Sequence, residues 1–178
     1  MKRAHVKIAL AVAAVAVVGS GAGTFATASS GSGDRETLTG YEEFPALSTP
    51  GAGEFRSSIS RSRDEIRYTL SFSDLETAAT QAHIHFENRT NNGPIVVFLC
   101  TNLGNGPAGT QACPAAGGTI QGTIRPADVG AGAAAQGLAA GEFDELVRAI
   151  RAGATYVNVH STGRPGGEIR AQLEHGDH

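Results

Sequence analysis

The sequence predicts an all-β domain, an antiparallel sandwich or barrel with one short capping helix. Short segments of alternating apolar and polar residues recur along the chain, Ile66 to Phe72 most clearly, with turn-forming residues between them. Glycine is abundant, 24 of 178 residues, and tryptophan is absent, which suits many short strands better than a helical bundle. A helical period occurs only near residues 141–152. This spacing of strands and turns is typical of sandwiches and barrels.

The first 28 residues are typical of a secretory signal peptide. A basic start at residues 1–7 precedes an apolar run at residues 8–18 and a small-residue region that ends at Ala28. The apolar run is too short to span a bilayer comfortably, although a retained membrane anchor is the alternative. We therefore expect a secreted or extracytoplasmic protein without a membrane span. Residues 29–35 are small and polar, and we expect a flexible linker there.

The charge of the mature chain argues against two classes of partner. The whole chain has 14 basic and 17 acidic residues, and the leader removes three basic residues and no acidic ones. The remaining 11 basic and 17 acidic residues give a net charge of −6 with histidine neutral. Nucleic acid and anionic lipid are therefore poor candidates for the principal partner. An extracellular or cell-envelope protein stays open as a partner.

Five strands are predicted before the cysteines. They cover residues 38–43, 53–60, 65–72, 81–86 and 95–99. Pro45 ends the first, because proline cannot donate to a strand ladder. The second and third form a hairpin with one buried and one solvated face. The last of the five is apolar without interruption, which predicts a central strand.

The two cysteines, Cys100 and Cys113, are predicted to form a disulfide that closes a glycine-rich loop. An even cysteine count in an exported chain favours a structural bridge, worth up to about 3 kcal/mol in the chain-entropy model. Their spacing lacks the Cys-x-x-Cys pattern expected of thiolate metal ligands or a redox pair.

The last third of the chain predicts a short strand, one helix and a closing hairpin. The strand covers residues 119–124, and the helix extends from Gly141 to about residue 152. Its apolar residues recur at i, i+3, i+4 and i+7, acidic residues cluster at its start, and Gly153 can end it. We expect this helix to cap the barrel. Residues 155–160 and 168–173 form the hairpin, around a Gly-Arg-Pro-Gly-Gly turn.

Three histidines form the candidate functional site. His83 and His85 alternate with apolar residues, so in an extended strand their side chains share one face. Tyr156, Asn158 and His160 share a face in the same way. If the two strands are neighbours, the three imidazoles converge on the outer, solvent-facing surface of the sheet. This arrangement predicts a metal site, and the alternative is a cluster of structural histidines held by hydrogen bonds.

Three further polar residues are candidates for orienting the imidazole rings. Asn158 lies on a histidine strand, and Glu168 and Arg170 are predicted to face outward together on the last strand. The alternative for Glu168 and Arg170 is an ordinary cross-strand ion pair, worth under about 1 kcal/mol. No nucleophile elbow, phosphate loop or paired catalytic carboxylates are recognisable, so we predict no catalytic residue.

Several segments resemble the CHRD family, which is named after repeats in chordin. They are Leu38-Thr39-Gly40, Ala82-His83-Ile84-His85, Tyr156-Val157-Asn158-Val159-His160 and Gly167-Glu168-Ile169-Arg170. The resemblance spans residues 36–173, which leaves a polar tail at residues 174–178. Ser161 stands where threonine is usual and Ala171 where glycine is usual, and the cysteine loop looks like an insertion.

The resemblance implies a fold more firmly than an activity. It implies an immunoglobulin-like Greek-key β-sandwich or barrel, distantly similar to copper,zinc superoxide dismutase, with a largely undefined biochemical role. By similarity to that dismutase, His83, His85 and His160 would be three copper ligands. No histidine lies between His85 and His160, so a dinuclear dismutase centre is excluded.

Three functions follow as hypotheses. The first is a secreted, non-enzymatic or weakly enzymatic copper-binding domain. The second is a module that binds a protein or the cell envelope through loops at residues 88–94 or 100–113, with structural histidines. The third is a mononuclear copper dismutase.

Overall fold

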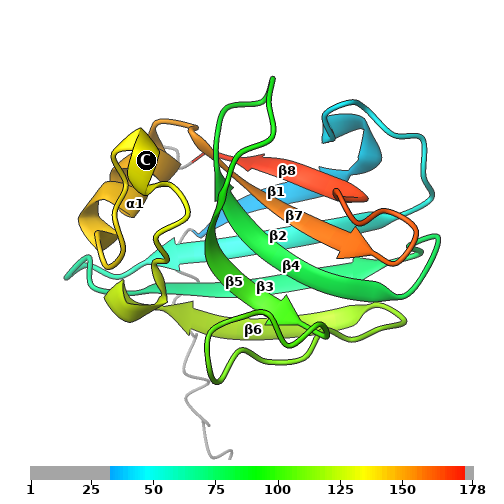
Figure 1. Cartoon of the computed structure of the whole chain (residues 1–178), viewed down its shortest axis with the longest axis horizontal. Helices are drawn as coiled ribbons and strands as arrows, with labels where there is room; N and C mark the ends of the chain where they lie inside the picture. The colour runs from blue at the N-terminus through cyan, green and yellow to red at the C-terminus, as the bar shows by residue number, and fades with distance from the viewer. Residues whose placement is uncertain (1–32, 175–178) are drawn as a thin grey trace, which may run out of the picture.

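The computed structural model describes residues 33–174 (Figure 1). The predicted signal peptide, most of the predicted linker and the tail after Glu174 lie outside the described residues. Eight antiparallel strands form one sheet that curls into a nearly closed barrel. The strands are β1 (Asp34–Thr39), β2 (Ala52–Ile59), β3 (Ile66–Ser73), β4 (Ala79–Phe86), β5 (Ile95–Thr101), β6 (Gly118–Ile124), β7 (Thr155–Ser161) and β8 (Ile169–Leu173).

The strand order confirms the all-β Greek-key fold class. It is β5-β4-β7-β8-β1-β2-β3-β6, so β4 neighbours β7 and β3 neighbours β6, although neither pair is consecutive in the chain. Such returns beside an earlier strand define a Greek key. The predicted hairpins are also confirmed, β2 with β3 and β7 with β8. The β4–β7 pairing is the one that brings the two histidine strands together.

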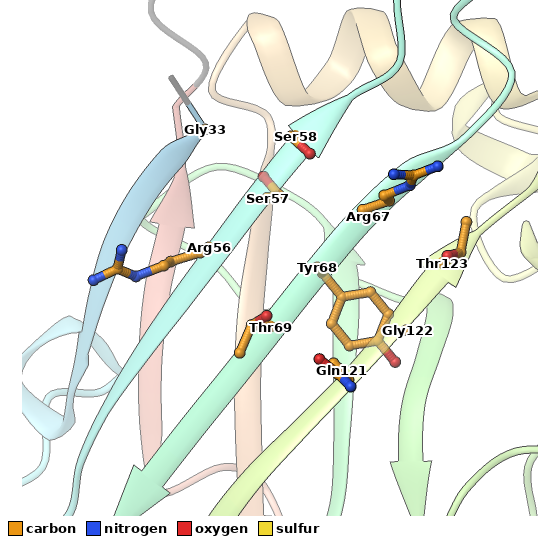
Figure 2. Close-up of a pocket in the computed structure, with 10 residues that line it drawn as sticks. All are labelled: Gly33, Arg56, Ser57, Ser58, Arg67, Tyr68, Thr69, Gln121, Gly122 and Thr123. Carbon is orange, nitrogen blue, oxygen red and sulfur yellow. The ribbon is translucent and has the colours of Figure 1, made fainter. Parts of the chain in front are cut away.

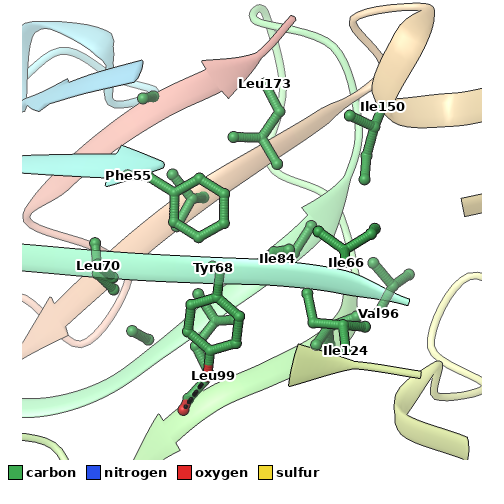
Figure 3. Packing of buried hydrophobic residues seen from close by; sticks show 14 of the residues in the cluster. Phe55, Ile66, Tyr68, Leu70, Ile84, Val96, Leu99, Ile124, Ile150 and Leu173 are labelled. Atoms are coloured by element: carbon green, nitrogen blue, oxygen red, sulfur yellow. Dashed lines mark hydrogen bonds between the residues drawn. The ribbon is translucent and has the colours of Figure 1, made fainter. Parts of the chain in front are cut away.

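The core lies inside the barrel, where every strand contributes apolar side chains (Figure 3). Phe55 stacks on Tyr68 with ring centroids 5.9 Å apart, and Ile84 on the opposite wall is 1% exposed. Each fully buried aliphatic or aromatic side chain contributes roughly 1.5–3 kcal/mol relative to exposure. This packing fixes the inner faces of β4 and β7, and so determines which residues of these strands point outward.

The predicted helix is confirmed as α1 (Phe143–Arg151), which lies at one end of the barrel (Figure 1). Leu146, Val147 and Ile150 are buried against the core, and Gly153 follows the helix in the left-handed conformation, φ +66°. Short 3-10 turns at Gly40–Glu42, Pro126–Asp128 and Ala134–Gln136 complete the helical structure. Within residues 33–174, no helix has both the length and the apolar character needed to cross a membrane.

The first strand differs from its prediction. β1 begins at Asp34, so the last two residues of the predicted linker belong to the sheet and pair with β2. The strand ends at Thr39 because the chain turns sharply at Gly40, whose carbonyl accepts hydrogen bonds from the backbone N–H groups of Glu43 and Leu47. Residues 40–43 therefore leave the sheet and start a loop that covers its outer surface.

The apolar sequence of β5 predicted a central strand, and this prediction is wrong. The strand β5 forms one end of the strand order. Loops take the place of a second neighbouring strand. The carbonyl of Val96 accepts a hydrogen bond from Gly130, and that of Leu99 accepts one from the Gln111 side chain. Buried backbone groups need such partners. Covering loops thus bury a strand that would otherwise be an exposed edge.

Candidate metal centre

His83, His85 and His160, the histidine cluster, meet on the outer face of β4 and β7. In the β4–β7 register Gln81 pairs with His160, and His85 pairs with Tyr156, so the three histidines occupy neighbouring outward positions. One ligand nitrogen from each ring lies within 4.8 Å of the others. His83 Nδ1 is 3.2 Å from His160 Nε2. The predicted convergence of the three imidazoles is therefore present.

The predicted exposure of the histidine cluster is wrong. His83 is 0%, His85 7% and His160 5% exposed. Phe98, directly opposite His83 on β5, covers it with an edge-on contact, the two ring centroids 4.5 Å apart. The loop before β5 and the turn between β7 and β8 supply further cover. The outer face of this part of the sheet is thus buried, and polar side chains occupy it.

Backbone carbonyls set the orientation of two of the rings. His85 Nδ1 lies 2.9 Å from the carbonyl oxygen of Gly93, and His160 Nδ1 lies 3.0 Å from that of Pro165. A carbonyl oxygen can only accept, so in the neutral rings Nδ1 carries the proton and Nε2 carries the lone pair. His85 Nε2 is thereby ready to act as a ligand, whereas His160 Nε2 accepts a hydrogen bond from His83 Nδ1 at 3.2 Å in the metal-free protein. His85 Nε2 and His83 Nε2 are buried and have no hydrogen-bond partner among residues 33–174.

The histidine cluster is neutral at physiological pH. Burial is the main cause that lowers the pKa of His83 to about 2, with smaller contributions from the neighbouring His160 and His85. Burial likewise lowers the pKa of His85 and of His160 to about 4. Neutral imidazole is the form that binds transition metals.

These shifts predict how the stability of the metal-free protein depends on pH. The unfolded chain binds more protons than the folded one between about pH 6.5 and 4, so stability falls as the pH falls through this window. Each histidine contributes on the order of 2–3 kcal/mol to this loss. Glu43 acts in the opposite direction, because burial raises its pKa to about 7. With three histidines against one carboxyl, we expect a lower urea midpoint at pH 4.5 than at pH 6.5 in EDTA. A higher midpoint at pH 4.5 would contradict the buried neutral histidines.

Arg170 reaches the histidine cluster through Tyr156. The Tyr156 ring stacks flat on the His85 ring, with centroids 4.7 Å apart and an interplanar angle of 2°. The Arg170 guanidinium lies over the Tyr156 ring at 3.4 Å. Arg170 is only 1% exposed and makes no hydrogen bond to a histidine within the described residues. Arg170 thus lies on the outer face as predicted, but its expected exposure is wrong, because loops cover it.

Glu168 and Asn158 make no hydrogen bond to the histidine cluster within residues 33–174. Glu168 is fully buried, and its carboxylate accepts hydrogen bonds from the Thr49 hydroxyl, the Glu76 backbone and the Ser161 hydroxyl. The expected exposure of Glu168 is thus also wrong. Asn158 donates instead to the buried carboxylate of Glu43, at 2.7 Å. No ion pair joins Glu168 to Arg170 in residues 33–174.

Sequence reasoning missed the residues that hold the rings. The Gly93 and Pro165 carbonyls leave no side-chain signal, and the loops that carry them cannot be placed from periodicity. Tyr156 did carry a signal, because it shares a face with His160. Glu43 is separated from Asn158 by 115 positions in the chain, so nothing local predicts their contact.

The predicted disulfide between Cys100 and Cys113 is confirmed. The loop that it closes lies beside the histidine cluster, because Asn105 donates to the Gln81 side chain at 3.0 Å and Gln81 pairs with His160. The bond is in keeping with an oxidising, extracytoplasmic compartment.

A hollow on the surface lies away from the histidine cluster (Figure 2). It has a volume of about 760 Å³ and lies over β2, β3 and β6. Arg56 and Arg67 stand at its sides, each paired with a glutamate, Glu54 and Glu65 respectively. These ion pairs neutralise the charges of the hollow. The side chains that converge as possible ligands are those of the histidine cluster.

Comparison with known proteins identifies the family. The model of the CHRD domain matches residues 35–173, which include both histidine strands and nearly all of the described chain. No curated protein and no solved structure shows a significant match. Because the family model matches nearly the whole described chain, which folds as an all-β Greek-key barrel, the chain belongs to the CHRD domain family.

Proposed function

We propose that this CHRD domain is an exported protein that binds one transition-metal ion, copper, through the histidine cluster. The observation that carries the proposal is the convergence of three buried, neutral imidazoles whose ligand nitrogens lie within 4.8 Å of one another. Metal–nitrogen bonds are near 2 Å, so small side-chain movements would let one ion contact all three. Imidazole nitrogen suits copper and zinc, and three ligands leave room for water or a further ligand.

Unpartnered nitrogens favour a metal over a purely structural cluster. A structural histidine is expected to donate or accept through both ring nitrogens when it is buried. In the described part of the chain, His83 Nε2 and His85 Nε2 have no such partner. Each buried polar group left unsatisfied costs roughly 1–3 kcal/mol. A purely structural cluster does not explain why the protein bears this cost in stability. A bound ion does, because it would use the lone pair of His85.

Metal binding is expected to raise the thermal stability of the protein. An ion that binds only the folded state, at a free concentration 100 times its dissociation constant, raises the free energy of unfolding by about 2.7 kcal/mol. We expect copper to raise the melting temperature of a mature chain carrying His175→Ala and His178→Ala, changes that remove the tail histidines. The same chain with His83→Ala and His160→Ala should show no such rise. An equal rise in both proteins would place copper elsewhere and contradict the proposal.

An exposed apolar residue favours a second candidate function, binding of a cell-envelope or extracellular protein. Leu103 lies at the surface of the disulfide-closed loop and is 56% exposed. Such a residue on a covalently fixed loop could contact a partner. Co-sedimentation of the mature protein with cell envelopes tests this: Leu103→Asp should abolish it and His83→Ala should not. A mononuclear dismutase activity would require the same ion, and superoxide removal by the copper-loaded protein tests it.

A further inference from the structure

Three side chains form a stack that ends at the histidine cluster. His85 is on β4, Tyr156 on β7 and Arg170 on β8, and these strands are consecutive in the sheet. Tyr156 therefore lies between the other two, 4.7 Å from the His85 ring and 3.4 Å from the Arg170 guanidinium carbon. A guanidinium over an aromatic face is a favourable cation–π contact, stronger when water is excluded. The stack places a fixed positive charge one ring away from a candidate ligand.

Hydrogen bonds hold this charge in place. The Arg170 guanidinium donates to the backbone carbonyls of Asn91, at 3.0 Å, and Asn88, at 2.9 Å. The same loop continues to Gly93, whose N–H donates to the Tyr156 hydroxyl and whose carbonyl accepts from His85. A guanidinium keeps its proton in proteins, so the charge persists even in this buried position.

The ligand set itself carries no compensating negative charge. The three members of the histidine cluster are neutral, and no carboxylate or thiolate belongs to the group. Two buried carboxyl groups on this domain are engaged in other contacts. Glu43 accepts from Asn158, and Glu168 is occupied by Thr49, Glu76 and Ser161. An ion held by the cluster would therefore feel the Arg170 charge in surroundings that water and salt screen little.

We propose that Arg170, acting across Tyr156, makes the histidine cluster selective for a monovalent over a divalent ion, so that Cu(I) is preferred to Zn(II). This proposal rests on the proposed metal site. Electrostatic repulsion from one fixed charge is twice as large for a divalent ion as for a monovalent ion at the same position. Arg170 is thus a positioning residue that also sets the charge the site tolerates, and it is not a ligand.

Two electrostatic changes of opposite sign test the proposal. Arg170→Gln removes the positive charge but keeps an amide that can donate to the Asn88 or Asn91 carbonyl. Glu43→Gln removes a negative charge and keeps an oxygen that can accept from Asn158. Burial raises the pKa of Glu43 to about 7, so measurements at pH 8 ensure that the native carboxyl is ionised. Arg170→Lys retains the positive charge without the planar stacking group.

The measured quantity is the ratio of Cu(I) to Zn(II) affinity in the mature chain with its tail histidines replaced. Competition with chromophoric chelators gives both values, the Cu(I) series under anaerobic conditions with ascorbate. We expect Arg170→Gln to lower the ratio on the order of tenfold. Glu43→Gln should raise it, and Arg170→Lys should stay near the parent value.

Distinct outcomes separate this proposal from the proposed function. An unchanged ratio in Arg170→Gln, or equal shifts in Arg170→Gln and Arg170→Lys, would overturn charge selectivity while leaving metal binding intact. Shifts of Glu43→Gln and Arg170→Gln in the same direction would indicate altered packing and also overturn it. If Arg170→Gln does not fold, as judged by circular dichroism, the direction of the Glu43→Gln shift decides. Absence of binding of either ion to the parent protein would overturn both proposals.

Discussion

Replacing Glu168 by alanine is expected to lower the free energy of unfolding by about 3–5 kcal/mol, since it leaves three donors unsatisfied, and this is a large share of the 5–15 kcal/mol typical of a domain. The Glu168 carboxylate is fully buried and accepts hydrogen bonds from the Thr49 hydroxyl and the Glu76 backbone N–H, each at 2.7 Å, and from the Ser161 hydroxyl. Alanine would leave these donors without an acceptor, and a hydrogen bond to a charged group contributes about 1.5–3 kcal/mol. The segments around Thr49, Glu76 and Ser161 would lose the hydrogen-bond acceptor that they share.

Urea unfolding followed by circular dichroism measures this effect. Glu168→Gln keeps one carbonyl acceptor and should lose less stability than Glu168→Ala. Glu174→Ala removes an exposed carboxylate and serves as the control, with a change within about 0.5 kcal/mol. If Glu168→Ala unfolded at the parent midpoint, the carboxylate would not anchor these loops.

His83→Leu is expected to weaken copper binding by more than about 100-fold while leaving the metal-free protein about as stable as before, because removal of an unpartnered buried nitrogen offsets the lost hydrogen bond to His160. His83 is fully buried; its Nδ1 lies 3.2 Å from His160 Nε2, and its Nε2 has no hydrogen-bond partner among residues 33–174. Burial of an unpartnered polar group is costly, whereas leucine fits apolar surroundings such as the Phe98 ring, 4.5 Å from the imidazole. A loss of one ligand out of three should weaken binding by more than about 100-fold, since even a residue that only supports a ligand costs 10–100-fold.

The two measurements together distinguish a metal site from a structural cluster. Chemical unfolding in EDTA gives the stability of the metal-free protein, and copper titration gives the affinity. A structural cluster predicts the reverse pattern, in which His83→Leu unfolds at lower urea and copper binding was never present. Val159→Ala, a core change on the neighbouring strand, is the matched control because it should lower stability without removing a ligand.

Alternation and turn chemistry were sufficient to predict most of the fold. Ile66 to Phe72 alternate in the sequence and form β3 with its apolar residues inward. The spacing of Phe143, Leu146 and Ile150 likewise predicted α1. The same rule placed the three histidines on one face of β4 and β7. These features depend on local periodicity, which the sequence carries directly.

The cover over the outer face could not be predicted in this way. All seven residues of β7 and all five of β8 are buried, although their alternation is that of half-exposed strands. The difference comes from loops far away in the chain, such as the one that bonds Asn92 to Phe44. A buried Arg170 in a polar network has the same sequence pattern as an exposed one. Burial of polar residues is therefore a tertiary property, decided by what the loops cover.

The most direct test of the account is a copper titration of the mature chain in which His175 and His178 are alanine. Isothermal titration calorimetry measures the binding. The account predicts one equivalent of copper bound to the parent protein and none to the His83→Ala/His160→Ala variant, which should retain the parent circular dichroism spectrum. Zinc is titrated in parallel and is expected to bind at the same site. No binding by the parent protein, or binding that survives in the folded double variant, would contradict a metal centre at the histidine cluster.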